Sequence, residues 1–167
     1  MSQPNTDISI YLNAGLFNAA ERLHTLYLEQ ALVKIGYKVI LPLREAVQFL
    51  KDGAFNLDEV TKHCQKLAGD KKNICVGSID GTDADSGTVV EYTIGVIKTG
   101  RAINYRSDFR TFREREIGIN AMLLLEGTTL VYHPAFFTDL REAERFYNDL
   151  ALKIHYAVQQ IDAGGRL

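Results

Sequence analysis

Five short apolar segments with β-strand character alternate along this chain with segments of helical periodicity. The strand-like segments are residues 7–13, 37–42, 73–79, 101–106 and 128–132. The helical patterns cover residues 19–35, 44–51, a segment from Asn56 or Asp58 to Leu67, and residues 89–98, 117–125 and 140–160. Alternating strands and helices predict βαβ crossovers, which give a parallel sheet covered by helices on both faces. Five strands favour an α/β, flavodoxin-like doubly wound sheet with strand order 2-1-3-4-5.

The length and charge of the chain narrow its class. A chain of 167 residues suits one domain over residues 1–167. Its 19 Lys and Arg residues against 21 Asp and Glu residues argue against a nucleic-acid groove, which needs a basic excess. No apolar run approaches the roughly 20 residues of a membrane span, and the N-terminus does not resemble a signal peptide. We therefore expect a cytoplasmic protein with neither a nucleic-acid nor a membrane partner.

The cysteines and histidines give no sign of a metal site. Cys64 and Cys75 are too few for a metal cluster or a disulfide framework, and the strand-like surroundings of Cys75 favour a core position. The four histidines are scattered without the spacing of metal ligands. We expect neither a metal nor a cofactor.

The segment from Asp80 to Glu91 holds four acidic residues where a buried strand ends and a helix begins. In an open parallel sheet, ligands bind outside the carboxyl ends of the strands, at the point where the strand order reverses. The order 2-1-3-4-5 puts this crevice between the first and third strands. The glycine-containing turn at residues 14–17 should therefore meet the acidic loop at residues 80–88, and we expect the functional site there.

Two of the acidic residues have distinct expected positions. Asp85 or Ser86 is placed to cap the helix, because a short side-chain oxygen accepts from free N–H groups of the first turn. Glu91 lies one to two turns further, among apolar residues, where a carboxylate is either paired or chemically active. The alternative is a purely structural capping arrangement.

The spacing Asp-Ser-Gly-Thr-x-x-Glu at residues 85–91 resembles the signature of the nucleoside 2-deoxyribosyltransferase family. Segments similar to other family elements occur in the family's order, at residues 10–17, 41–45, 106–110 and 119–122. The resemblance spans roughly residues 8 to 125. It implies transfer of 2-deoxyribose from a deoxyribonucleoside to a free nucleobase, through a covalent deoxyribosyl-glutamate intermediate and with net retention.

The resemblance also implies roles for single residues. Glu91 matches the nucleophile and Asp85 the aspartate that contacts the sugar. Asn120 matches an asparagine that reaches the site from a neighbouring subunit, which implies a homo-oligomer, dimer or hexamer, with shared active sites. Because the nucleophile must be ionised, we expect N–H groups near the helix N-terminus and the hydroxyl of Tyr11 to keep the pKa of Glu91 low.

The remaining expected contacts concern the base and its proton. Phe17 is a candidate to stack on the base, and Arg44 or Arg110 to bind its exocyclic oxygen. Counting back from Glu91 without gaps, Gln65 stands where relatives often carry an aspartate that protonates the departing base, so Asp80 and Asp83 are alternative donors. The expected substrate-binding residues are Gly15, Phe17, Arg44, Gln65, Asp80, Ser86, Gly87, Arg110 and Asn120.

Two other functions stay open. A nucleotide or deoxynucleotide N-glycosidase of the same fold would use water as acceptor and hold a 5′-phosphate. The polar segment at residues 107–115, predicted as an irregular mobile loop, would supply its arginines as a lid or as phosphate contacts, although Asp85 would repel a phosphate. A non-catalytic nucleotide-binding module would make Glu91 structural and bind without turnover. A response-regulator receiver is disfavoured, because the first strand ends in Asn13-Ala-Gly and not in an acidic pair.

Overall fold

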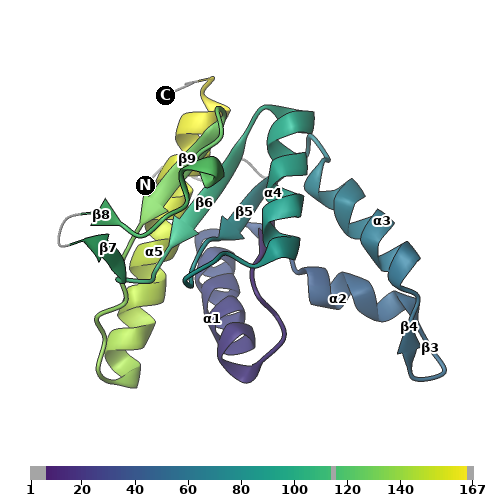
Figure 1. Ribbon diagram of the computed structural model, residues 1–167, viewed down its shortest axis with the longest axis horizontal. Helices are drawn as coiled ribbons and strands as arrows, with labels where there is room; N and C mark the ends of the chain where they lie inside the picture. The colour runs from purple at the N-terminus through teal and green to yellow at the C-terminus, as the bar shows by residue number, and fades with distance from the viewer. Residues whose placement is uncertain (1–6, 114–115, 165–167) are drawn as a thin grey trace.

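The computed structural model describes residues 7–113 and 116–164, and its centre is a five-stranded parallel sheet (Figure 1). The strands are β1 (Ser9–Asn13), β2 (Lys38–Ile40), β5 (Asn73–Ser78), β6 (Ala102–Arg106) and β9 (Thr128–Tyr132). They pair in the order β2-β1-β5-β6-β9, and every pairing is parallel. Numbered by their occurrence, these strands have the order 2-1-3-4-5, which confirms the predicted flavodoxin-like sheet.

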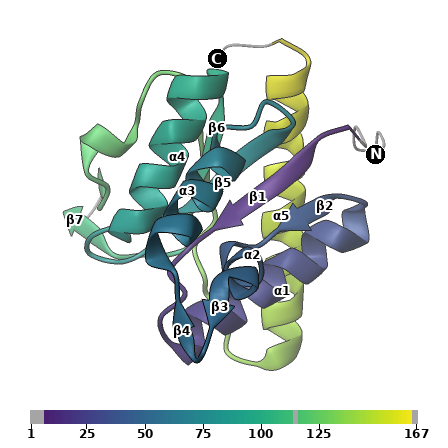
Figure 2. The same cartoon turned by 90° about the vertical axis from the view of Figure 1, so that its right-hand side faces the viewer.

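Helices cover both faces of this sheet (Figures 1 and 2). The helices are α1 (Ala19–Ile35), α2 (Pro42–Ala46), α3 (Leu57–Ala68), α4 (Ser86–Thr99) and α5 (Leu140–Asp162). Helices α1 and α5 pack together on one face, and α3 and α4 on the other. Within the described part of the chain, no helix has the length and apolar character that crossing a membrane requires.

The side chains of β1 alternate between the two faces, as strand geometry requires. Ile10 and Leu12 join the larger core under α1 and α5, and Tyr11 joins a smaller cluster with Cys75 and Tyr92 under α3 and α4. Each of these five side chains is at most 1% exposed. The two faces of the sheet therefore have separate cores, and Tyr11 belongs to the smaller one.

The helix ends agree closely with the capping residues of the sequence. Asn18 caps α1 in a reciprocal capping box with Glu21, and Gly36 ends the helix in the left-handed conformation. Of the two candidates for the start of α3, Asn56 is the cap. The last helix is capped by Asp139, and the hydroxyl and N–H of the preceding Thr138 donate to the Glu142 carboxylate.

The segment after β6 differs from the prediction. Residues 107–115 were expected to be irregular and residues 117–125 helical; instead β7 (Thr111–Arg113) pairs antiparallel with β8 (Glu116–Ile117), and only a 3-10 turn, η2 (Ala121–Leu123), follows. Arg115 lies outside the described residues. The Leu123 carbonyl accepts from the Tyr92 hydroxyl and from the Asn104 amide, so tertiary hydrogen bonds hold this segment to α4 and β6.

The helix after β2 is also shorter than the predicted one, which covered residues 44–51. Pro42 opens α2 directly after the strand, so the strand ends at Ile40 and not at residue 42. A 3-10 turn, η1 (Val47–Phe49), follows α2, and β3 (Leu50–Lys51) then pairs with β4 (Ala54–Phe55) in a small hairpin. Asp52 and Gly53 form the turn of this hairpin, and both residues have positive φ, 51° and 80°.

Two glycines allow α4 to lie unusually close to β5. A Cβ atom on Gly95 of α4 would stand 2.9 Å from the Cys75 Cβ. A Cβ atom on Gly77 of β5 would stand 3.2 Å from the Asn13 Oδ1 atom and 3.4 Å from the Thr88 Cγ2 atom. This contact fixes the helix that carries Glu91 against the ends of β1 and β5.

We expect Gly95→Ala to destabilise the fold. The added methyl group overpacks the contact with Cys75, which costs about 1–3 kcal/mol, while the better helix propensity of alanine returns up to about 1 kcal/mol. Urea unfolding measures the difference, with Ile97→Ala on the exposed side of α4 as control. A Gly95→Ala protein at least as stable as the wild type would contradict the close approach.

Candidate active site

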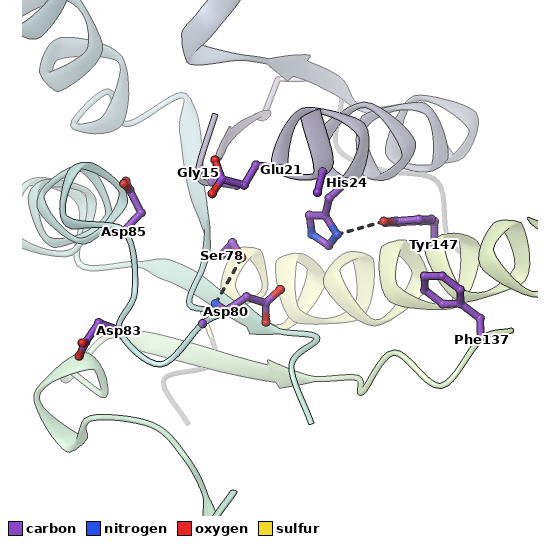
Figure 3. A pocket seen from close by; sticks show the side chains of 12 residues that line it. Gly15, Glu21, His24, Ser78, Asp80, Asp83, Asp85, Phe137 and Tyr147 are labelled. Atoms are coloured by element: carbon purple, nitrogen blue, oxygen red, sulfur yellow. Dashed lines mark hydrogen bonds between the residues drawn. The ribbon is translucent and has the colours of Figure 1, made fainter. Parts of the chain in front are cut away.

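A cavity of about 640 Å³ opens at the carboxyl ends of β1 and β5 (Figure 3). Both loops that the strand order was expected to bring together contribute to its wall. The lining residues are Ala14, Gly15, Ala20, Glu21, His24, Ser78, Asp80, Gly81, Asp83, Asp85, Phe137 and Tyr147. The volume falls in the range of small-molecule sites, about 300–1,000 Å³.

The charge of this wall is entirely of one sign. Four carboxylates line the cavity, those of Glu21, Asp80, Asp83 and Asp85, and among the described residues no lysine or arginine lines it. Such a wall repels phosphate and favours neutral ligands rich in hydrogen-bond donors.

Asp80 and Asp85 have different hydrogen-bond partners. Asp85 is the N-cap of α4, and its carboxylate accepts from the Thr88 N–H at 2.8 Å, as predicted for this residue. Asp80 accepts from the Ser107 N–H at 2.6 Å, the Asp108 N–H at 2.8 Å and the Ser107 hydroxyl. Asp80 therefore ties the loop after β5 to the loop after β6. Because its carboxylate accepts three hydrogen bonds, Asp80 is better suited to holding the two loops together than to donating a proton, the role considered from the sequence.

Glu91 lies in the second turn of α4, with its carboxylate near the Tyr11 hydroxyl and the Asn13 amide. Burial raises the pKa of Glu91 from its ordinary value of 4.5 to about 7. The Tyr11 and Asn13 side chains lower this pKa and the charge of Asp85 raises it, but both effects are smaller than that of burial. The expectation that the pKa of Glu91 is low is therefore wrong for the unliganded protein.

Tyr11 faces Glu91 from β1. Burial, followed by the charge of Glu91, raises the pKa of Tyr11 far above its usual range, so the phenol keeps its proton. The hydroxyl is buried and has no partner of normal hydrogen-bond geometry among the described residues, although the Glu91 carboxylate and the Cys64 thiol are near enough to affect its pKa. An unsatisfied buried hydroxyl costs about 1–3 kcal/mol, and here it leaves a donor available beside Glu91.

Three residues of this region were not singled out from the sequence. Asn13 is buried at the end of β1, and its amide donates to the Thr88 carbonyl at 3.1 Å. A polar residue two positions after Tyr11 points to the same face of the strand, which was an available signal. His24 and Tyr147 meet in the cavity from α1 and α5, and no sequence pattern connects residues so far apart.

Tyr11, Glu91 and four of the predicted contact residues are not among the described residues that line the cavity. The guanidinium of Arg44 binds the Glu29 carboxylate in a two-pronged pair, and that of Arg110 binds Asp108 in the same way. Gln65 is exposed on α3, whereas its neighbour Cys64 is turned toward Tyr11. The Phe17 side chain is 77% exposed before the start of α1.

Ser86 and Asn120 line a second hollow of about 380 Å³ on the other side of the acidic loop. This hollow shares Gly81 and Asp83 with the cavity. The exposed Asn120 side chain accepts from the Met122 N–H at 3.0 Å. Gly87 leaves room for the cap, because a Cβ atom there would stand 3.2 Å from the Asp85 Oδ2 atom.

The comparisons with known proteins support the fold. No protein-family model and no curated protein matches the sequence. A solved structure of a 2-deoxyribosyltransferase from the psychrotolerant bacterium Bacillus psychrosaccharolyticus is similar, with a TM-score of 0.54 and 22% sequence identity. The match covers 81% of this chain and 90% of that chain. The two proteins share the flavodoxin-like α/β fold.

We expect Glu91→Gln to stabilise the fold increasingly as the pH rises. The pKa of Glu91 is about 4.5 unfolded and about 7 folded, so ionising it opposes folding between these values. The amide removes this effect, which reaches on the order of 3 kcal/mol above pH 7 and vanishes below pH 4.5. Urea unfolding at pH 5 and pH 8 measures it, with Glu126→Gln on the surface as control. A Glu91→Gln effect that does not grow between these two pH values would contradict the buried carboxylate.

Proposed function

We propose that this protein transfers 2-deoxyribose between nucleobases, with Glu91 as the nucleophile. The observation that carries the proposal is the half-buried Glu91 carboxylate beside the Tyr11 hydroxyl, six residues after the capping Asp85. A site at the switch point of the sheet and a structural neighbour described as a 2-deoxyribosyltransferase support it.

In the proposed reaction, the Glu91 carboxylate attacks C1′ of a deoxyribonucleoside. The C1′–N bond breaks, its electron pair stays on the base nitrogen, and the leaving base takes up one proton from water. The transition state has oxocarbenium character, so the negative charge of Glu91 stabilises it. A second base then displaces Glu91 from the deoxyribosyl ester, and two inversions give net retention.

The neighbours of Glu91 have separate roles in this scheme. The Tyr11 hydroxyl donates to the carboxylate and orients it, and Asp85 accepts from the sugar 5′-hydroxyl. Because the pKa of free Glu91 is about 7, a large fraction is protonated at neutral pH. Only the ionised form attacks, so kcat/KM should rise with pH through about 7 before levelling off.

The acidic wall of the cavity favours a nucleoside over a nucleotide substrate. A nucleotide N-glycosidase needs a cation or free N–H groups for the 5′-phosphate, but the cavity offers four carboxylates and no lysine or arginine. The ionisation of Glu91 opposes folding, and catalysis explains why a carboxylate is kept in this position whereas simple nucleotide binding does not. Both considerations favour the transferase.

The test is base exchange, followed chromatographically. Wild-type protein with a deoxyribonucleoside and a second free base should yield the new deoxyribonucleoside, and ribonucleosides should react poorly because a 2′-hydroxyl crowds Glu91. Without acceptor base, intact-mass spectrometry should find a deoxyribosyl adduct on Glu91. Glu91→Gln should lose several orders of magnitude in rate and form no adduct.

Each competing function gives a different result in this test. Release of free base without exchange identifies a hydrolase, and binding without turnover identifies a binding module. Equal turnover of ribonucleosides removes the deoxyribose preference. An adduct on another residue, or an active Glu91→Gln protein, overturns the assignment of the nucleophile.

We also propose a homo-oligomer in which Asn120 of one subunit completes the site of another. A small domain leaves its crevice open, and a glycosyl-enzyme ester must be kept from water. Asn120 is exposed beside the acidic loop, where a neighbouring subunit can approach.

Mixing inactive Glu91→Ala with inactive Asn120→Ala protein should restore part of the activity. Some interfaces in the mixture then join an intact Glu91 to an intact Asn120. The measurement is the exchange rate after subunit exchange, which mass spectrometry of the assembly verifies. A fully active monomer in the ultracentrifuge, or verified mixing without recovered activity, excludes the shared site.

A further inference from the structure

A chain of four hydrogen-bonding side chains begins and ends in the wall of the cavity. The two ring nitrogens of His24 lie 3.0 Å from the Tyr147 hydroxyl at Nδ1 and 2.9 Å from the Tyr105 hydroxyl at Nε2. Tyr105 is fully buried and interacts through its hydroxyl with Ser78. Ser78, His24 and Tyr147 all line the cavity, and Figure 3 shows the imidazole directed at Tyr147.

The protons of this chain have two balanced arrangements. Burial lowers the pKa of His24, so its ring is neutral and carries one N–H. With the proton on Nδ1, the imidazole donates to Tyr147, whose own hydrogen is then free to point into the cavity. With the proton on Nε2, the imidazole donates to Tyr105, and Tyr147 donates to Nδ1 and offers the cavity only an acceptor. A switch takes up one proton from water at Ser78 and releases one at Tyr147, or the reverse.

The cavity wall near Tyr147 also suits a planar ring. Phe137, Tyr147 and His24 present aromatic surface to the cavity. Tyr147 is held from behind by Tyr27, with ring centroids 5.2 Å apart and planes at 12°, and from the side by Phe146 at 5.1 Å. We call this aromatic part of the wall, formed by His24, Phe137 and Tyr147, the slot, and its Tyr147 hydroxyl is held in place by the hydrogen bond with His24.

The position of this slot agrees with the direction of the proposed attack. Tyr11, next to Glu91, belongs to the cluster under α3 and α4, whereas Tyr105 and Tyr147 belong to the core under α1 and α5. Glu91 and the slot therefore lie on opposite sides of the sheet ends. A displacement with inversion needs the nucleophile and the leaving base on opposite sides of C1′.

We propose that the slot formed by His24, Phe137 and Tyr147 binds the nucleobase, and that the tautomer of His24 makes the Tyr147 hydroxyl a donor to an oxo group or an acceptor from an amino group. The naming of the ligand as a nucleobase rests on the proposed function. Purines present these two groups at the same ring position, O6 as acceptor or N6–H₂ as donor. A switchable hydroxyl accommodates both, as a site that exchanges one base for another requires.

The experiment is ¹⁵N NMR of the His24 imidazole in Glu91→Gln protein, which prevents turnover, titrated with free adenine or free hypoxanthine. The spectrum reports which nitrogen carries the proton, and His24→Gln assigns the signal. Adenine should move the proton to Nε2 and hypoxanthine to Nδ1. Tyr147→Phe should weaken the binding of both bases about tenfold, the effect of one lost hydrogen bond. Tyr27→Phe is the matched control, since it removes a hydroxyl from the same ring stack outside the cavity lining.

The outcomes separate this inference from the proposed function. The same His24 tautomer with both bases, no shift with either, or unchanged affinity in Tyr147→Phe overturns the slot even if the wild type exchanges bases. The expected tautomer switch in a protein that exchanges no base supports the slot and removes the transferase. An equal loss of affinity in Tyr27→Phe would show that packing of the stack, and not the Tyr147 hydroxyl, holds the base.

Discussion

The close packing of α4 on β5 is the constraint on which the site depends. Gly77 and Gly95 remove the side chains that would hold the helix away, and the remaining gap leaves no room for a methyl group at Gly95. Because α4 lies so near the sheet, its second turn brings Glu91 to the end of β1, beside Tyr11 and Asn13. A helix set further out would leave Glu91 in water with an ordinary pKa.

The position of Glu91 lowers the stability of the fold when its carboxylate is ionised, which is the form that the proposed reaction needs. Burial raises the pKa of the carboxylate to about 7, so at higher pH the fold carries a charge that it only partly compensates. The Tyr11 hydroxyl has no partner of normal hydrogen-bond geometry among the described residues, which adds a second cost to stability beside Glu91. Groups held in this way, at a cost to stability, are typical of sites that act on a ligand.

Hydrogen bonds from the end of β6 and from the start of the loop after it hold the acidic loop in place. Asp80 accepts three hydrogen bonds from the start of the loop after β6, and the buried Arg106 donates to the carbonyls of Ile79 and Gly81. Asp83 and Asp85 line the cavity together with His24, whereas Glu91 lies on α4, which covers the other face of the sheet. One loop thus joins the two halves of the proposed reaction, the nucleophile and the base.

The sequence by itself determined the sheet and most helix ends, because strand alternation, Asn18, Gly36 and Asp85 act through local geometry. It also located the acidic loop, since the carboxyl ends of parallel strands meet at one edge. Tertiary structure decided the rest. Residues 117–125 have helical periodicity, but the structure has only a 3-10 turn there, and hydrogen bonds from Tyr92 and Asn104 tie this turn to α4 and β6. The pKa of Glu91 and the meeting of His24 with Tyr147 follow from burial and from contacts between distant elements, which no local pattern encodes.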